Sequence, residues 1–92
     1  IDLRTISPCD WDTVINSVKK TGRCVIVHEA VKTCGFGAEI AATINEKALL
    51  SLQAPVLRVA SPNVPTPMAR LENYYLPDEK RIVKAIEEVM KY

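Results

Sequence analysis

Apolar residues recur every three to four positions after Asp10, a spacing that predicts an amphipathic helix ending near Lys20. The apolar positions of this segment are Trp11, Val14, Ile15 and Val18. Asp10 is a suitable N-cap residue, and Gly22 suits the left-handed conformation that closes many helices. We therefore expect a surface helix that packs on the rest of the domain by one face.

A continuous apolar run follows this helix and predicts a buried strand from Cys24 to Glu29. Both of its faces are apolar, which is typical of a central parallel strand covered by helices on both sides. A glycine-flanked turn over residues 35–37 then leads to a predicted helix from Ala38 to Leu50, and Val56 to Val59 is the next short strand. This alternation of strand and helix predicts an α/β fold with a parallel sheet.

The two ends of the chain complete the predicted pattern. Residues 1–6 look extended and predict the end of a strand that begins before the sequence does. The proline-rich stretch 61–77 predicts an irregular connection, and a last helix is expected from Pro77 or Asp78 with a broad apolar face. Three strands are few for a parallel sheet, so we expect further strands from upstream sequence or from a neighbouring chain.

Composition narrows the class of protein. The 92 residues suffice for one small domain, 1–92, and the net charge of +1 comes from interspersed basic and acidic residues. No basic tract indicates a nucleic-acid partner, and no apolar run approaches the roughly 20 residues that a membrane helix needs. The three cysteines lack a C-x-x-C pair, so neither a zinc site nor a disulfide framework is expected, and a reducing compartment fits best.

Gly35, Phe36 and Gly37 resemble the beginning of a dinucleotide-binding fingerprint, in which backbone amides approach a pyrophosphate. The pattern then fails, because Ile40 stands where a third small residue is needed. We interpret the two glycines as permitting a tight turn and close packing, with Phe36 as its anchor.

His28 and Glu29 stand at the carboxyl end of a predicted strand, where doubly wound sheets bind their ligands. His28 is the only histidine, and no nucleophile or metal-ligand spacing accompanies it. We therefore interpret it as a hydrogen-bonding or interface residue. No catalytic, cofactor-binding or metal-binding residue is assigned in this chain.

Several phrases of the sequence, in this order and spacing, resemble one domain family along essentially the whole chain. They are IDLRTISP (1–8), SVKKTGR (17–23), VHEA (27–30), GFGAEIAA (35–42), APVLRV (54–59), VPTP (64–67) and LPDEKRIVKAI (76–86). The chain resembles the carboxyl-terminal, transketolase C-terminal-like domain of the beta subunit of a thiamine-diphosphate-dependent 2-oxo acid dehydrogenase.

The resemblance implies a three-layer α/β/α fold whose mostly parallel sheet has lost an amino-terminal strand and helix upstream of Ile1. It implies that the complete oxidoreductase decarboxylates pyruvate or a branched-chain 2-oxo acid and transfers the acyl group to a lipoyl acyltransferase. The resemblance also implies that the full enzyme uses thiamine diphosphate and magnesium, with the pyrophosphate and the magnesium on the alpha subunit. The contacts of the beta subunit to the activated ring would come from its amino-terminal domain. This domain by itself is therefore expected to be inactive and to bind no cofactor.

The implied partners are an alpha subunit and a second beta subunit in a heterotetramer, and the dihydrolipoyl acyltransferase. The implied location is the bacterial cytoplasm, or the mitochondrial matrix in a eukaryote. The candidate interface or docking residues are His28, Glu29, Phe36, Glu87, Glu88 and Tyr92. In the family that the chain resembles, an acidic residue is common at the position of Gln53, and an aromatic residue is usual after VPxP, where this chain has Met68.

Substrate choice stays open, since residues 28–30 and 33–35 look like branched-chain enzymes whereas residues 44–59 look like bacterial pyruvate enzymes. Two rival functions also stay open. One is a free-standing α/β module that binds an anion or nucleotide at the glycine turn, and the other is a transketolase-type enzyme domain.

Overall fold

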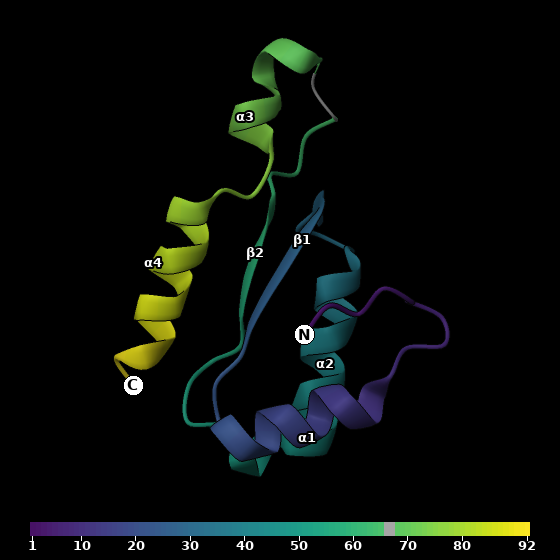
Figure 1. Cartoon of the computed structure of the whole chain (residues 1–92), viewed down its shortest axis with the longest axis vertical. Helices are drawn as coiled ribbons and strands as arrows, with labels where there is room; N and C mark the ends of the chain where they lie inside the picture. Colours follow the sequence, from purple (N-terminus) through teal and green to yellow (C-terminus); the bar gives the residue numbers. More distant parts are fainter. Residues whose placement is uncertain (66–67) are drawn as a thin grey trace.

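Two parallel strands run through the middle of the molecule, with helices on either side of them (Figure 1). The computed structural model describes residues 1–65 and 68–92. Its elements in chain order are α1 (Trp11–Thr21), β1 (Val25–Val31), α2 (Phe36–Ala48), a 3₁₀ turn (Leu49–Ser51), β2 (Leu57–Ser61), a second 3₁₀ turn (Ala69–Leu71), α3 (Glu72–Tyr75) and α4 (Glu79–Met90).

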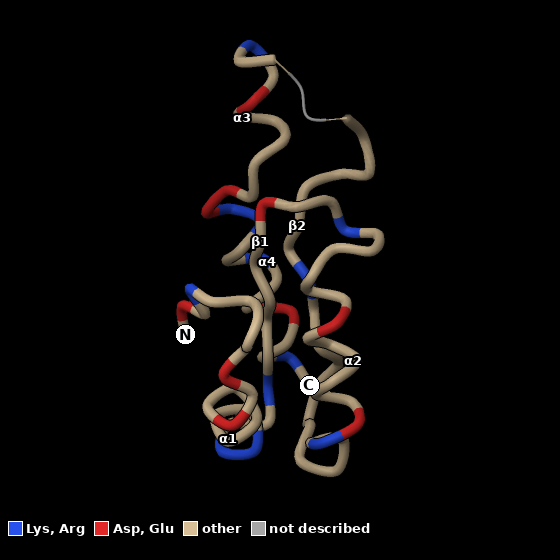
Figure 2. The backbone as a smooth tube through the Cα atoms, turned by 90° about the vertical axis from the view of Figure 1, so that its right-hand side faces the viewer, with Lys and Arg blue, Asp and Glu red and all other residues tan. Residues whose placement is uncertain are grey.

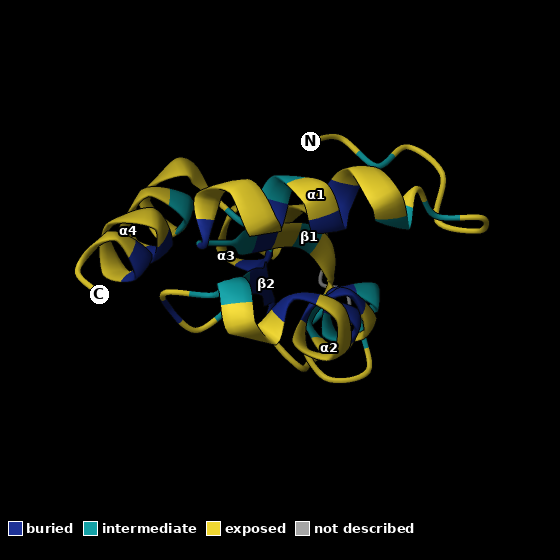
Figure 3. Ribbon diagram, turned by 90° about the horizontal axis from the view of Figure 1, so that it is seen from below, coloured by how far each residue is buried: buried dark blue, intermediate teal, exposed yellow. Residues whose placement is uncertain are grey.

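The strand pair fixes the layers. Val25 pairs with Leu57 and Val27 with Val59, and the register becomes irregular between Val27 and Val31. The helix α2 lies on one side of the strands and α4 on the other, while α1 crosses near the start of β1 (Figure 3). The described chain therefore has the predicted α/β class, with a parallel sheet between helical layers.

The helix α1 begins and ends where the sequence predicts. The Asp10 carboxylate accepts hydrogen bonds from the Thr13 backbone N–H (3.2 Å) and from the Thr13 hydroxyl (2.7 Å), which satisfies a free donor of the first turn. These two bonds lower the pKa of Asp10. At the other end Gly22 has φ +73° and its N–H donates to the Val18 carbonyl at 2.7 Å. A non-glycine residue would be strained there.

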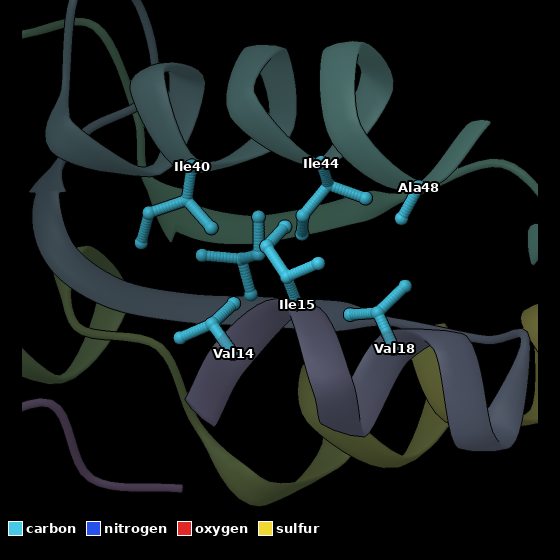
Figure 4. Packing of buried hydrophobic residues seen from close by; sticks show 7 residues of the cluster. Val14, Ile15, Val18, Ile40, Ile44 and Ala48 are labelled. Atoms are coloured by element: carbon cyan, nitrogen blue, oxygen red, sulfur yellow. The ribbon is translucent and has the colours of Figure 1, made fainter. Parts of the chain in front are cut away.

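One core cluster joins α1, β1 and α2 (Figure 4). Its members are Val14, Ile15, Val18, Ile26, Ile40, Ile44 and Ala48. The predicted stripe of α1 thus faces the apolar side of α2, and Ile26 is the residue through which β1 contributes. Ile44 has no exposed surface at all, which makes it the centre of this cluster.

The predicted strand at residues 1–6 is wrong. The described sheet contains only β1 and β2, and the first residues run as an irregular segment with Ile1 and Ile6 mostly exposed. Leu3 packs against the core cluster, and the segment and β1 line the same cavity of about 630 Å³. The segment is nevertheless not part of the described sheet, and an extended segment forms a strand only beside a partner. The described order is consequently helix, strand, helix, strand and two helices, and not three strand–helix units.

The expectation that both faces of β1 are covered is wrong at Val27, which is 45% exposed. The predicted broad apolar face of α4 is also only partly covered. Ala85 and Val89 are buried against the strands, whereas a neighbouring row of apolar residues is exposed. We call this row, Val83, Ile86 and Met90, the α4 stripe.

Smaller corrections concern boundaries. The strand β1 starts and ends slightly later than predicted, and α2 starts at Phe36, so that Gly35 caps the helix and Gly37 lies inside it. The connection after β2 is not wholly irregular, because it contains a 3₁₀ turn and α3. The VPTP phrase at 64–67 lies partly outside the described residues. Among the described helices, none is both long and apolar enough to cross a membrane.

Candidate functional site

His28 lies on β1 and is half-buried beside the first turn of α2. Its Nδ1 lies 3.0 Å from the Ala30 carbonyl, which assigns the ring proton to that nitrogen as donor. Its Nε2 is buried and has no hydrogen-bond partner among the described residues. The ring is therefore held in one orientation by its own strand.

The two glycines make room for this ring. A side chain at Gly37 would collide with Nε2 and Cδ2 of His28, and one at Gly35 would come within 2.9 Å of its Cε1. The helix N-terminus, which a nucleotide site would leave open for a phosphate, is thus occupied by an imidazole. This packing supports the structural interpretation of the glycine turn.

The other two candidates at this end of β1 have different environments. Glu29 is exposed, while Phe36 is half-buried and packs on Trp11 with ring centroids 6.1 Å apart. Phe36 thus packs the start of α2 against α1. Any interface role of His28, Glu29 or Phe36 stays a prediction.

A second group of polar residues meets at the beginning of β1, where α4 also ends. The Arg23 guanidinium donates from Nε to the Val89 carbonyl (3.0 Å), from Nη2 to the Tyr92 backbone oxygen (2.7 Å) and from Nη1 to Gln53 Oε1 (2.8 Å). The last carbonyls of a helix lack partners within the helix and carry its negative dipole end. Arg23 therefore caps α4 and ties it to the loop before β2.

A cleft of about 470 Å³ lies beside this group, between the end of α2 and Tyr92. Its walls include Leu49, Leu52 and Val56, together with Gln53 and Tyr92. Leu49 is 54% exposed and the adjacent Leu50 is completely exposed. The structure thus places an apolar surface next to the predicted docking residue Tyr92.

Glu87 and Glu88 are exposed on α4, and Tyr92 is 63% exposed. Figure 2 shows acidic and basic positions mixed along the backbone. The structure therefore brings three of the six candidate residues to the α4 end of the molecule and leaves the other three at the far end of β1. Their docking role is not tested by this placement.

The described residues contain no group of His, Cys, Asp and Glu side chains that could hold a metal ion. Burial raises the pKa of the Cys24 thiol, so it is a poor nucleophile, whereas Cys34 is exposed.

Arg23 is the residue that our reading of the sequence missed. A cation placed directly after a helix-closing glycine and directly before an apolar strand is a weak signal. Its partners lie 30, 66 and 69 positions away, and no local pattern reveals them.

Comparison with known proteins gives the family. Residues 1–82 match the profile of the family "Transketolase, C-terminal domain". The chain is 47% identical over its whole length to the pyruvate dehydrogenase E1 component subunit beta of Bacillus subtilis (strain 168), of which it covers 28%. It is 51% identical over its whole length to the mitochondrial 2-oxoisovalerate dehydrogenase subunit beta of Dictyostelium discoideum, of which it covers 25%.

A third relative is the 3-methyl-2-oxobutanoate dehydrogenase subunit beta of Mycobacterium tuberculosis (strain CDC 1551 / Oshkosh), 44% identical over 99% of this chain and 26% of that protein. The chain spans about a quarter of the length of these curated relatives. The relatives include both pyruvate and branched-chain enzymes, and they confirm the resemblance to dehydrogenase beta subunits. The chain belongs to the transketolase C-terminal domain family.

Proposed function

We propose that these residues form the carboxyl-terminal domain of the beta subunit in the decarboxylating component of a 2-oxo acid dehydrogenase complex. The complete enzyme would oxidatively decarboxylate pyruvate or a branched-chain 2-oxo acid, with thiamine diphosphate and magnesium bound outside this domain. The domain itself would serve subunit assembly and docking of the dihydrolipoyl acyltransferase.

The observation that carries the docking role is the surface at the end of α4. There Arg23 joins Tyr92 to Gln53 beside an apolar cleft, and Glu87 and Glu88 are exposed on the last turns of the same helix. Apolar walls beside exposed charges are the usual composition of a protein interface. Acidic side chains would steer a basic docking domain of the acyltransferase.

Two other surfaces support the assembly role. The α4 stripe exposes three apolar side chains on one helix face, and Val27 is exposed on the neighbouring sheet. Exposed apolar groups that gather in one region mark interaction sites. We assign these surfaces to contacts with the rest of the beta subunit and with the alpha and second beta subunits.

The docking role can be tested in the assembled dehydrogenase. Glu87→Gln with Glu88→Gln should weaken acyltransferase binding at low salt and flatten its salt dependence, because exposed charges act over a Debye length of about 10 Å at 0.1 M salt. Lys84→Gln, which changes an exposed charge of opposite sign on the same helix, is the matched control. Unchanged affinity and an unchanged salt slope in the double variant would contradict an acidic docking contact.

The absence of a cofactor role is a separate proposal. Isothermal titration of the purified domain with thiamine diphosphate and magnesium should show no saturable heat. Saturable binding at micromolar cofactor would contradict this assignment and favour an anion- or nucleotide-binding module.

A further inference from the structure

We propose that α4 is a latch, a helix that opens from the sheet as a unit while the core of α1, β1 and α2 stays folded, and that two arginines hold it closed. The inference goes beyond the proposed function, because it concerns how the chain holds its last helix and not which partner binds there. In the closed position α4 covers the outer edge of β2.

Apolar packing holds α4 less firmly than it holds α2. Figure 1 shows α4 beside β2, on the side of the strands opposite α2. Among the described residues, the core cluster takes members from α1, β1 and α2 but none from α4. The helix α4 buries Ala85 and Val89, whereas α2 buries five residues that include Ile40 and Ile44. Because the free energy gained from apolar burial scales with the area removed from water, α4 gains much less from packing than α2.

Two arginines hold the two ends of α4. Arg23, which precedes β1, donates from Nε to the Val89 carbonyl (3.0 Å) and from Nη2 to the Tyr92 backbone oxygen (2.7 Å). Arg81, in the first turn of α4, donates from Nη2 to the Ala60 carbonyl of β2. Hydrogen bonds from a charged donor are about twice as strong as neutral ones, and the bonds to Val89 and Ala60 are partly buried. The arginine bonds therefore contribute a large share of the free energy that keeps α4 on the sheet.

The bond from Arg81 also covers the outer edge of β2. The Leu57 N–H donates to the Cys24 carbonyl, and successive residues of a strand direct their backbone groups to alternate edges. The Ala60 carbonyl therefore points away from β1, toward the start of α4. An unpaired strand edge is a template for another strand, so release of α4 would make this edge available.

The connection before α4 suits a hinge. Leu76 and Asp78 have extended backbones, with ψ 144° and 170°, and Pro77 lies between them. The Asp78 carboxylate accepts a hydrogen bond from the Arg81 backbone N–H at 2.9 Å, so the helix carries its own N-cap when it moves. Arg23 stays with the core, because its Nη1 also donates to Gln53 Oε1 (2.8 Å) on the loop before β2. Opening can therefore occur by rotation at residues 76–78.

Native-state hydrogen exchange read by mass spectrometry in the full-length beta subunit tests this inference. A helix of 12 residues is marginal in water by itself, so the amides of a released α4 exchange with solvent. The amides of α4 should exchange at least about tenfold faster than those of α2. Their exchange should also depend less on denaturant, because local opening exposes less surface than global unfolding.

Two variants test the arginines. Arg23→Gln and Arg81→Gln should each speed exchange in α4 by about tenfold, the factor that corresponds to one hydrogen bond to a charged group, and leave exchange in α2 unchanged. Arg58→Gln is the matched control, because Arg58 also donates to a backbone oxygen, that of Lys32 (2.8 Å) in the loop after β1. Lys80→Gln controls for the loss of a positive charge from the first turn of α4, where Lys80 is exposed. Both controls should leave exchange in α4 close to that of the wild type.

Equal exchange rates with equal denaturant dependence in α2 and α4 of the wild-type protein would overturn the inference, because the domain would then unfold as one unit. This wild-type measurement decides the matter even if an arginine variant does not fold. Arginine variants that leave exchange in α4 at the wild-type rate, or that speed exchange in α2 as much as in α4, would also overturn it.

Discussion

The two faces of the strand pair differ in how far this chain covers them. On the α2 side, α1 and α2 enclose Ile26 in a shared cluster whose members are all buried. On the α4 side, Ala85 and Val89 are buried, but Val27 and the α4 stripe are exposed. These residues therefore complete one apolar core by themselves, whereas they leave apolar surface exposed on the other face.

Removing apolar side-chain volume should have very different effects on the two faces. Ile44→Ala, in the complete core, should destabilise by about 2–5 kcal/mol, because it removes buried methyl groups and leaves a cavity. Ile86→Ala, in the α4 stripe, should cost under about 1 kcal/mol in the domain studied alone. Chemical denaturation followed by circular dichroism measures both.

The same Ile86→Ala change should cost more in the assembled dehydrogenase, where we expect the stripe to be covered. An equal and small cost in both settings would show that the stripe stays in contact with solvent. In that case the greater exposure of the α4 face would not reflect a contact with another part of the enzyme.

The next largest effect is expected at the glycine that makes room for His28. Gly37→Ala should destabilise by about 1–3 kcal/mol, the usual cost of overpacking, because its Cβ would collide with the imidazole. The double variant with His28→Ala should recover much of this loss, since the ring is then absent. A thermal-unfolding cycle of the four proteins measures the coupling between the two residues.

Failure of His28→Ala to rescue Gly37→Ala would mean that the glycine is required for its backbone and not for the ring. A substitution at Gly35 is a less clean test, because its Cβ would also collide with the Val31 carbonyl.

Local patterns were sufficient for α1, α2, α4 and the two strands that pair, but not for α3, which lies in the stretch predicted to be irregular. The stripe from Trp11 to Val18, the Asp10 cap and Gly22 each act within one or two turns of helix, so the sequence shows them directly. The strand predicted at residues 1–6 was wrong because extended residues form a strand only beside a partner strand, and the described sheet pairs only β1 with β2.

The candidate site was less predictable than the fold. Glu87, Glu88 and Tyr92 were singled out from a family resemblance, but the contacts of Arg23 cross most of the chain and could not be inferred from spacing. The contact between His28 and Gly37 was also hidden, although both residues had been noticed separately.

The open edge of β1 offers a smaller effect. The Leu57 N–H donates to the Cys24 carbonyl, and successive residues of a strand direct their backbone groups to alternate edges. Val25 and Val27 therefore point theirs away from β2, toward the 630 Å³ cavity. We expect a strand from the rest of the beta subunit to pair there, because an open edge is a template for another strand.

Hydrogen exchange read by mass spectrometry tests this expectation. In the full-length subunit the Val25 and Val27 amides should exchange as slowly as that of Ile26, whereas in the isolated domain only Ile26 should be slow. Fast exchange of Val27 in the full-length subunit would show that the edge is free. Protection that appears only after the alpha subunit is added would assign the strand to that partner.

The smallest expected effect is a change in stability at acidic pH when Asp10 is replaced. Asp10 caps α1, which belongs to the complete core on the α2 side of the strands. The Thr13 hydroxyl and backbone N–H hold the pKa of Asp10 below its ordinary value of 3.8. Because the folded pKa is lower than the unfolded one, the stabilisation is present above the unfolded pKa and is lost as pH falls through the folded pKa. Asp10→Asn should therefore lower the melting temperature slightly at pH 7, and the difference from wild type should shrink below about pH 4.

Two further variants serve as controls. Thr13→Val, which removes only the hydroxyl donor, should give a smaller change in melting temperature with the same pH dependence. Asp12→Asn controls for the loss of one negative charge in the first turn of the helix. A difference between Asp10→Asn and wild type that stays constant from pH 7 to pH 3 would show that the cap acts without its charge.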